Sequence, residues 1–128
     1  MKRNTVSGSR SVSRLASMRH AVRGVMRLLE TQMNARIHAG AALAVTAMGY
    51  WLEISFLEWG LLILAMGLVL CAEAVNTAIE FVVDLASPQW SALARDAKDV
   101  AAGAVLLASV AACGAGLAVF VPRLWERL

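Results

Sequence analysis

Hydrophobic positions recur at helical spacing near the N-terminus of this chain and then fill three long runs. In the first segment they form one apolar stripe, made of Leu15, Met18, Val22, Val25, Met26 and Leu29. Arg19, Arg23 and Arg27 flank that stripe at intervals of four residues. The pattern predicts an amphipathic helix over about 13–30 that lies in a membrane interface. The alternative, a core helix of a soluble bundle, needs partner helices that the rest of the chain does not supply.

The three apolar runs are Ile37–Leu52, Trp59–Ala72 and Val100–Val121. The third is uncharged and has 22 residues, enough for a bilayer that takes about 20. The first has only 16 residues, so it must extend toward Glu30–Arg36 to cross. The second crosses only if Glu73 and Glu80 lie inside it. We therefore predict an all-α integral membrane protein with transmembrane helices over about 34–52, 56–85 and 97–122.

The polar segments set the remaining boundaries. Residues 1–12 are polar and without periodicity, which predicts a disordered basic N-terminus, and residues 123–128 form a C-terminal tail. Residues 13–122 between them are expected to form a single membrane domain. Ser87 and Pro88 end the second span, and Ser87 is expected to cap a short surface helix before Arg95.

Composition and charge agree with this class. The chain is 59% hydrophobic, against roughly half for a soluble domain, and its mean hydropathy is +0.65. Eight of its twelve Lys and Arg lie between Lys2 and Arg36, where Glu30 is the only acid, so this end is expected to meet an anionic surface. Nucleic acid is not expected as a partner, because the basic arm passes straight into an apolar span. Cys71 and Cys113 stand alone, as buried free thiols do.

The loop charges orient the spans. Ten of the twelve Lys and Arg fall on the side of the N-terminus and the 85–99 loop, against two on the other side. The positive-inside rule puts the former side on the cytoplasmic face of a cell membrane. Trp51, Trp59 and Trp125 sit at the opposite ends of the spans, where interface anchors belong.

The second span carries a polar face. At about 100° per residue, one side of the helix holds Glu73, Asn76, Thr77, Glu80 and Asp84, and the far side holds Leu64, Leu68, Val75, Ile79 and Val82. Each carboxylate near mid-bilayer costs some ~2.5–3.5 kcal/mol, so several on one stripe indicate function. The alternative is a satisfied ion-pair network at the cytoplasmic interface.

The depth of each group indicates its chemistry. Glu73 is deepest by helical rise, and a deep carboxylate suits a general base acting on a hydroxyl at the lipid boundary. An acid nearer water, paired with another oxygen ligand, suits Mg²⁺ on nucleotide phosphates. Lys98 either meets a phosphate or pairs with Asp99 at the start of the third span. The known P-loop and protein-kinase motifs are absent from the sequence. The residues alone indicate a membrane enzyme or transporter with a carboxylate-lined site facing the cytoplasm.

Small residues form rows on two spans, and such rows let helices approach closely in lipid. The rows are Gly67, Cys71, Ala74 and Ala78 on the second span, and Ala104, Ala108, Ala112 and Gly116 on the third. Three spans are not expected to enclose the polar face unaided. We therefore predict a homo-oligomer.

The segment EAVNTAIEFVVDLASPQWSALARDAKDVAAGAVLL, from Glu73 to Leu107, resembles the signature of the prokaryotic diacylglycerol kinase and undecaprenol kinase family. The resemblance extends over about Ser17–Val121. It implies a homotrimer of three-span protomers, each with an N-terminal surface helix, and active sites shared between subunits. It also implies transfer of the ATP γ-phosphate to a lipid alcohol, diacylglycerol or undecaprenol. The NTAIE and KDVAAGAVLL segments resemble the undecaprenol branch more.

By position in that motif, Glu73 matches the catalytic base and Glu80 a ligand of the Mg²⁺ bound to ATP. The polar nucleotide site is matched by Asn76, Asp84, Lys98 and Asp99. Where members carry a second metal-binding glutamate, this chain has Gln32, and Glu30 would point roughly 200° away on a continuous helix. Gln32 coordinates through its carbonyl, or Glu30 reaches the metal through altered helix geometry, or the metal is held differently.

Two rival functions follow from the same residues. A proton-coupled exporter would use Glu73 alone. It does not need the further polar residues that continue from Glu73 toward the cytoplasmic edge. A non-enzymatic assembly factor would tolerate replacement of Glu73 or Glu80. The basic N-terminal helix fits all three functions and discriminates none of them.

Overall fold

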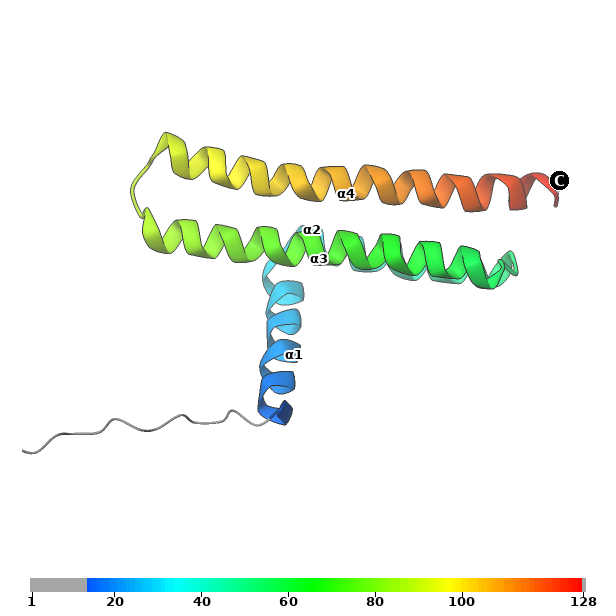
Figure 1. Cartoon of the computed structure of the whole chain (residues 1–128), viewed down its shortest axis with the longest axis horizontal. Helices are drawn as coiled ribbons and strands as arrows, with labels where there is room; N and C mark the ends of the chain where they lie inside the picture. The colour runs from blue at the N-terminus through cyan, green and yellow to red at the C-terminus, as the bar shows by residue number, and fades with distance from the viewer. Residues whose placement is uncertain (1–13, 128) are drawn as a thin grey trace, which may run out of the picture.

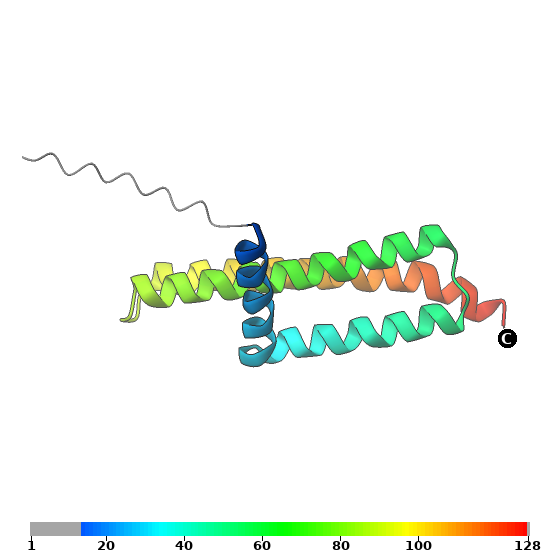
Figure 2. The same ribbon diagram turned by 90° about the horizontal axis from the view of Figure 1, so that it is seen from below.

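The computed structural model describes residues 14–127, so the segment expected to be disordered, residues 1–12, lies outside the described residues. Its four α-helices are α1 (Arg14–Thr31), α2 (Met33–Trp51), α3 (Phe56–Ala86) and α4 (Ala92–Trp125). Helices α2, α3 and α4 run side by side with alternating direction, and α1 lies across them (Figures 1 and 2). The prediction of an all-α chain with a separate N-terminal helix is confirmed.

The loop between α3 and α4 is shorter than predicted. Ser87 does not cap a surface helix: it ends α3, and its backbone N–H donates to the Val83 carbonyl at 2.8 Å. Ser91 is the N-cap of α4, with its hydroxyl accepting from the Ala94 N–H at 3.4 Å. The predicted separate helix was wrong because no Gly or Pro interrupts the chain between Ala92 and the apolar run. The extra turns belong to α4 itself.

The turn between α2 and α3 is fixed by backbone hydrogen bonds. The Ile54 N–H donates to the Gly49 carbonyl at 3.2 Å and the Glu53 N–H to the Tyr50 carbonyl at 3.3 Å, which is a Schellman motif. Glu53 takes the left-handed conformation that this motif requires, with φ of 52°. Ser55 and Glu58 then form a capping box that starts α3. Together these caps hold α2 antiparallel to α3.

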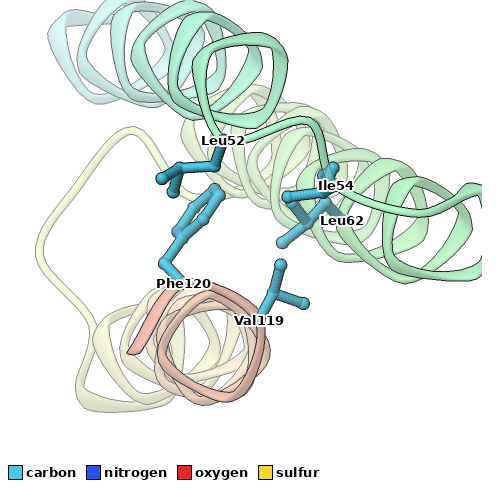
Figure 3. Close-up of a cluster of buried hydrophobic side chains, with 5 residues drawn as sticks. All are labelled: Leu52, Ile54, Leu62, Val119 and Phe120. Carbon is cyan, nitrogen blue, oxygen red and sulfur yellow. The ribbon is translucent and has the colours of Figure 1, made fainter. Parts of the chain in front are cut away.

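The best-packed region of the protomer lies at this turn. Leu52, Ile54, Leu62, Val119 and Phe120 form a buried cluster joining the turn to α3 and α4 (Figure 3). Arg123 on α4 donates two hydrogen bonds to the Glu58 carboxylate, at 3.0 and 2.6 Å. Trp59, expected as an interface anchor, is half-buried and faces the backbone of Gly49. Trp51 and Trp125 are exposed.

The outer surface of the helices is apolar. Within the described residues, α3 and α4 are long and apolar enough to cross a membrane, and α2, the predicted first span, is not among them. Cys71 and Cys113 are exposed on this surface. The expectation of buried thiols was wrong because an apolar run in such a chain faces outward as readily as inward.

Candidate functional site

The polar face predicted on α3 is turned into the protomer. Glu73, Asn76 and Thr77 are 1%, 7% and 4% exposed, Glu80 is half-buried and Asp84 is exposed. Burial therefore decreases along α3 toward its C-terminal end. On the far side Leu64, Leu68, Val75 and Val82 are exposed and Ile79 is half-buried, so the predicted division of faces is confirmed.

One protomer encloses more of this face than expected. The argument that three spans cannot enclose it was wrong for Glu73, Asn76 and Thr77, all of which are buried in a single chain. The reason is the close packing of α3 on α4, where Ala101, Val105 and Ala108 are buried. Small side chains on α4 let the two helices approach.

Asn76 links the buried and the half-buried parts of the face. Its Nδ2 donates to the Glu80 Oε1 at 3.2 Å, while the Thr77 hydroxyl donates to the Glu73 carbonyl at 2.9 Å. The Asn76 Oδ1 is buried and has no hydrogen-bond partner among the described residues. A buried acceptor without a donor costs about 1–3 kcal/mol, which indicates a place where a ligand or a water donates.

Lys98 joins the site from α4. Its Nζ donates to the Asp84 Oδ1 at 2.5 Å, across the loop that separates α3 from α4. Asp99 does not meet Lys98 and pairs instead with Arg95, at 3.8 Å. The structure therefore brings Lys98 and Asp84 together and leaves Asp99 on the exposed face of α4.

The two candidate metal ligands of the N-terminal segment lie at the junction of α1 and α2. Gln32 is extended, with φ −108° and ψ 118°, and is half-buried, while Glu30 is exposed in α1. The chain leaves the helix at Gln32, between α1 and α2, so the separation of roughly 200° that a continuous helix would give does not apply to Glu30 and Gln32. Within residues 14–127 no three His, Cys, Asp or Glu side chains are grouped as a metal site.

A groove of about 360 Å³ separates α1 from α3 beside the polar face. It is lined by Ala21, Gly24, Val25, Arg27, Leu28, Ala74, Thr77, Ala78 and Phe81. The sequence did not reveal this groove, because its shape depends on how α1 crosses α3. The available signal was a face of small residues on α1, Ala21 and Gly24, next to the apolar stripe.

Comparison with known proteins identifies the family of the chain. The profile of a family described as prokaryotic diacylglycerol kinase matches residues 19–120. The chain belongs to the prokaryotic diacylglycerol kinase family. An undecaprenol kinase of Bacillus subtilis (strain 168) is 43% identical over 105 residues, which cover 82% of this chain and 85% of that protein.

Other relatives in the prokaryotic diacylglycerol kinase family carry a different acceptor in their names. A diacylglycerol kinase of Synechocystis sp. is 42% identical over 111 residues, 86% of this chain and 63% of that protein. A diacylglycerol kinase of Escherichia coli (strain K12) is 36% identical over 72 residues, 56% of this chain and 59% of that protein.

Membership in the prokaryotic diacylglycerol kinase family makes the chain a lipid kinase, a phosphotransferase that uses ATP. The family consists of membrane proteins, in agreement with the two long apolar helices. The alternative function, a proton-coupled exporter that would use Glu73 alone, is thereby set aside.

Proposed function

We propose that this lipid kinase transfers the γ-phosphate of ATP to the hydroxyl of undecaprenol, with diacylglycerol as the second candidate acceptor. The observation that carries the proposal is the burial gradient on α3, from the enclosed Glu73 to the exposed Asp84. Such a gradient suits a reaction between a lipid alcohol on the buried side and a nucleotide on the exposed side.

Glu73 acts as the general base in this proposal. Its carboxylate belongs to a side chain that is 1% exposed, where bulk water does not compete for the proton of the attacking hydroxyl. The neighbouring Thr77 lines the apolar groove beneath α1, so an apolar chain has a path to within one helical turn of Glu73. The base and the acceptor are thus held together by the same stretch of α3.

Glu80 and Asn76 are proposed to hold Mg²⁺ together with the nucleotide phosphates. Mg²⁺ in nucleotide sites takes one or two protein carboxylates and completes its shell with phosphate oxygens and water, so a half-buried Glu80 beside the unpaired Asn76 Oδ1 fits it. When bound, the ion neutralises charge on the phosphates. Gln32 is the proposed weak further ligand, through its amide carbonyl, and Glu30 its alternative.

Lys98, Asp84 and Asp99 are proposed to serve the nucleotide on the exposed side. A Lys98 Nζ fixed by Asp84 presents a positive charge at the ends of both α3 and α4. Phosphate groups of ATP carry the complementary charge, and positioning them is most of what a phosphoryl-transfer site has to do.

The placement of α1 supports a cytoplasmic site at a membrane interface. Because α2 returns antiparallel to α3, its 19 residues bring Gln32 back roughly to the level of Val75 at a rise of about 1.5 Å per residue. An amphipathic α1 lying in the interface there would put Glu73 at the lipid boundary. The proposed protomer has three transmembrane helices and a cytoplasmic N-terminus, as the distribution of Lys and Arg favours.

A homotrimer is the proposed assembly. In the described protomer Gly67 and Cys71 are exposed, and a Cβ placed on Gly67 would meet nothing within 4 Å. This open half of the small-residue row on α3 supports contact with another copy, and the number three follows from the family resemblance.

The proposed acceptor rests on the relatives. The similarity to the undecaprenol kinase spans 85% of that protein, whereas the two diacylglycerol kinases are covered over 63% and 59% of their lengths. These relatives support undecaprenol as the first acceptor to offer.

Transfer from labelled ATP with Mg²⁺ in detergent micelles tests the proposal. Undecaprenol and diacylglycerol are offered separately to the wild type, to Glu73→Gln and to Glu53→Gln, an exposed acid at the opposite end of α3. We expect transfer to undecaprenol in the wild type and in Glu53→Gln, and a loss of at least about a hundredfold in Glu73→Gln. Transfer that survives in Glu73→Gln would remove the base assignment, and transfer to diacylglycerol alone would change the acceptor.

A further inference from the structure

The groove between α1 and α3 is apolar except for one hydroxyl and one cation. Seven of its nine lining residues are Ala, Gly, Val, Leu or Phe, and the two others are Thr77 and Arg27. An apolar groove accepts a hydrocarbon chain, and a guanidinium at its wall attracts an anion. The ligand that matches both properties is an amphiphile with an anionic head group.

Arg27 is distinct among the arginines of α1. Arg14, Arg19 and Arg23 do not line the groove, although all are exposed on the same helix. Leu28, the next residue after Arg27, is 8% exposed and is the buried residue of α1. The backbone of Arg27 is therefore held against the protomer while its side chain is free to reach a head group.

The groove also adjoins the proposed reaction centre. Thr77 is 4% exposed in its wall, and the Thr77 hydroxyl donates to the backbone carbonyl of Glu73 at 2.9 Å. If the proposed function holds, an uncharged lipid alcohol gains a phosphate at this place. The charge that appears on the lipid is the one that a guanidinium binds best, through two parallel hydrogen bonds.

Resting on the proposed function, we propose that Arg27 binds the phosphate of the lipid phosphate product in the α1–α3 groove. Arg27 is then a specificity-determining residue, because it makes the groove prefer the phosphorylated lipid to the lipid alcohol. Its occupant is a single apolar chain with a phosphomonoester head. The kinase is consequently inhibited by its own product.

A matched pair of short isoprenoids, farnesyl phosphate and farnesol, tests this preference without turnover. Full-length protein in micelles is titrated with farnesyl phosphate and followed by ³¹P NMR, and farnesol is added as a competitor. We expect Arg27→Gln to weaken farnesyl phosphate binding about tenfold and to leave farnesol unchanged. Arg23→Gln, the matched control one turn away on the same helix, is expected to stay within about twofold, and Arg27→Lys to recover part of the loss.

Each contrary result has a distinct meaning. Equal weakening by Arg27→Gln and Arg23→Gln would show a general positive field and overturn the proposal. Loss of farnesol binding in Arg27→Gln would show a distorted groove and overturn it as well. An absence of any ³¹P shift with the wild type would show that the groove does not bind the phosphorylated lipid, and it would overturn the proposal too. A raised KM for ATP in Arg27→Gln with unchanged farnesyl phosphate binding would assign Arg27 to the nucleotide and overturn the lipid assignment.

The binding readout separates this inference from the proposed function. Wild-type protein that binds farnesyl phosphate through Arg27 but transfers no phosphate to undecaprenol or diacylglycerol would overturn the proposed function and support the groove assignment. If the wild type transfers phosphate and Arg27→Gln binds farnesyl phosphate as Arg23→Gln does, the proposed function is supported and the groove assignment is overturned.

Discussion

At the scale of single residues, Asn76 buries a polar atom without a hydrogen-bond partner, which lowers the stability of the fold. Its amide nitrogen is satisfied by Glu80, whereas its buried carbonyl oxygen has no donor among the described residues. A residue kept only for stability would not leave a buried acceptor unpaired, because that costs about 1–3 kcal/mol. We interpret the unpaired oxygen as a group that contacts a bound ligand or ion.

Replacing Asn76 tests this directly. Asn76→Leu is similar in shape and removes the unpaired oxygen, so we expect the free energy of unfolding in micelles to stay equal or rise by up to about 2 kcal/mol. We expect kinase activity to fall at least about a hundredfold, because the Glu80 carboxylate loses the group that orients it. Thr77→Val, which removes a hydroxyl from the same buried face, is the matched control for stability. A variant that is both less stable and active would show that Asn76 is structural.

At the scale of the elements, the pairing of Lys98 with Asp84 ties the end of α3 to the start of α4. Both side chains are partly exposed, so the pair contributes little to stability. Its value lies in fixing a flexible lysine where the two helices converge. The two residues should therefore act on ATP binding as one unit.

A double-mutant cycle measures the coupling between Asp84 and Lys98 in ATP binding. We expect Asp84→Asn and Lys98→Met each to raise the KM for ATP about tenfold, and the double variant to be no worse than Lys98→Met alone. Asp96 is an exposed acid on α4 that pairs with Arg95, and Asp96→Asn is the control. We expect it to leave the KM for ATP within about twofold of the wild type. Additive effects of the first two variants would mean that Asp84 contacts the nucleotide independently of Lys98.

The elements also show what the sequence could and could not predict. The rotation per residue of a helix is fixed, so the polar and apolar faces of α3 followed from spacing alone. The break between the first two helices was also predicted, but the direction in which α1 leaves α2 was not, because Gln32 is an ordinary residue and its extended backbone has no Gly or Pro to mark it. The bonds from Arg123 to Glu58 join positions 65 residues apart, and only the antiparallel packing of α3 on α4 brings them together. The faces of one helix can be predicted from residue spacing, whereas side-chain pairs between helices depend on how the helices pack.

At the scale of the whole molecule, the two ends of the helical hairpins have different tasks. The end holding the Schellman turn, the buried cluster and the Glu58–Arg123 pair is closed by packing (Figure 3). The other end carries the polar face of α3, the α1–α3 groove and the short loop between α3 and α4. A rigid far end can hold α3 and α4 in register while the end with the proposed site stays accessible to nucleotide and lipid.

The outer face of α3 leads to the last prediction, which concerns assembly. Gly67 is exposed and its surroundings are empty in the protomer, so Gly67→Leu fits the single chain and blocks a neighbour that packs on this row. We expect light scattering in micelles to show a lower mass for Gly67→Leu with unchanged helix content by circular dichroism. Gly114→Leu on α4 introduces the same side chain at another open glycine outside the predicted rows, and it should keep the wild-type mass. If Gly67→Leu also keeps that mass, the row on α3 is a lipid-facing surface and the subunits meet elsewhere; if its mass and its kinase activity fall together, the active site needs a neighbouring subunit to be complete.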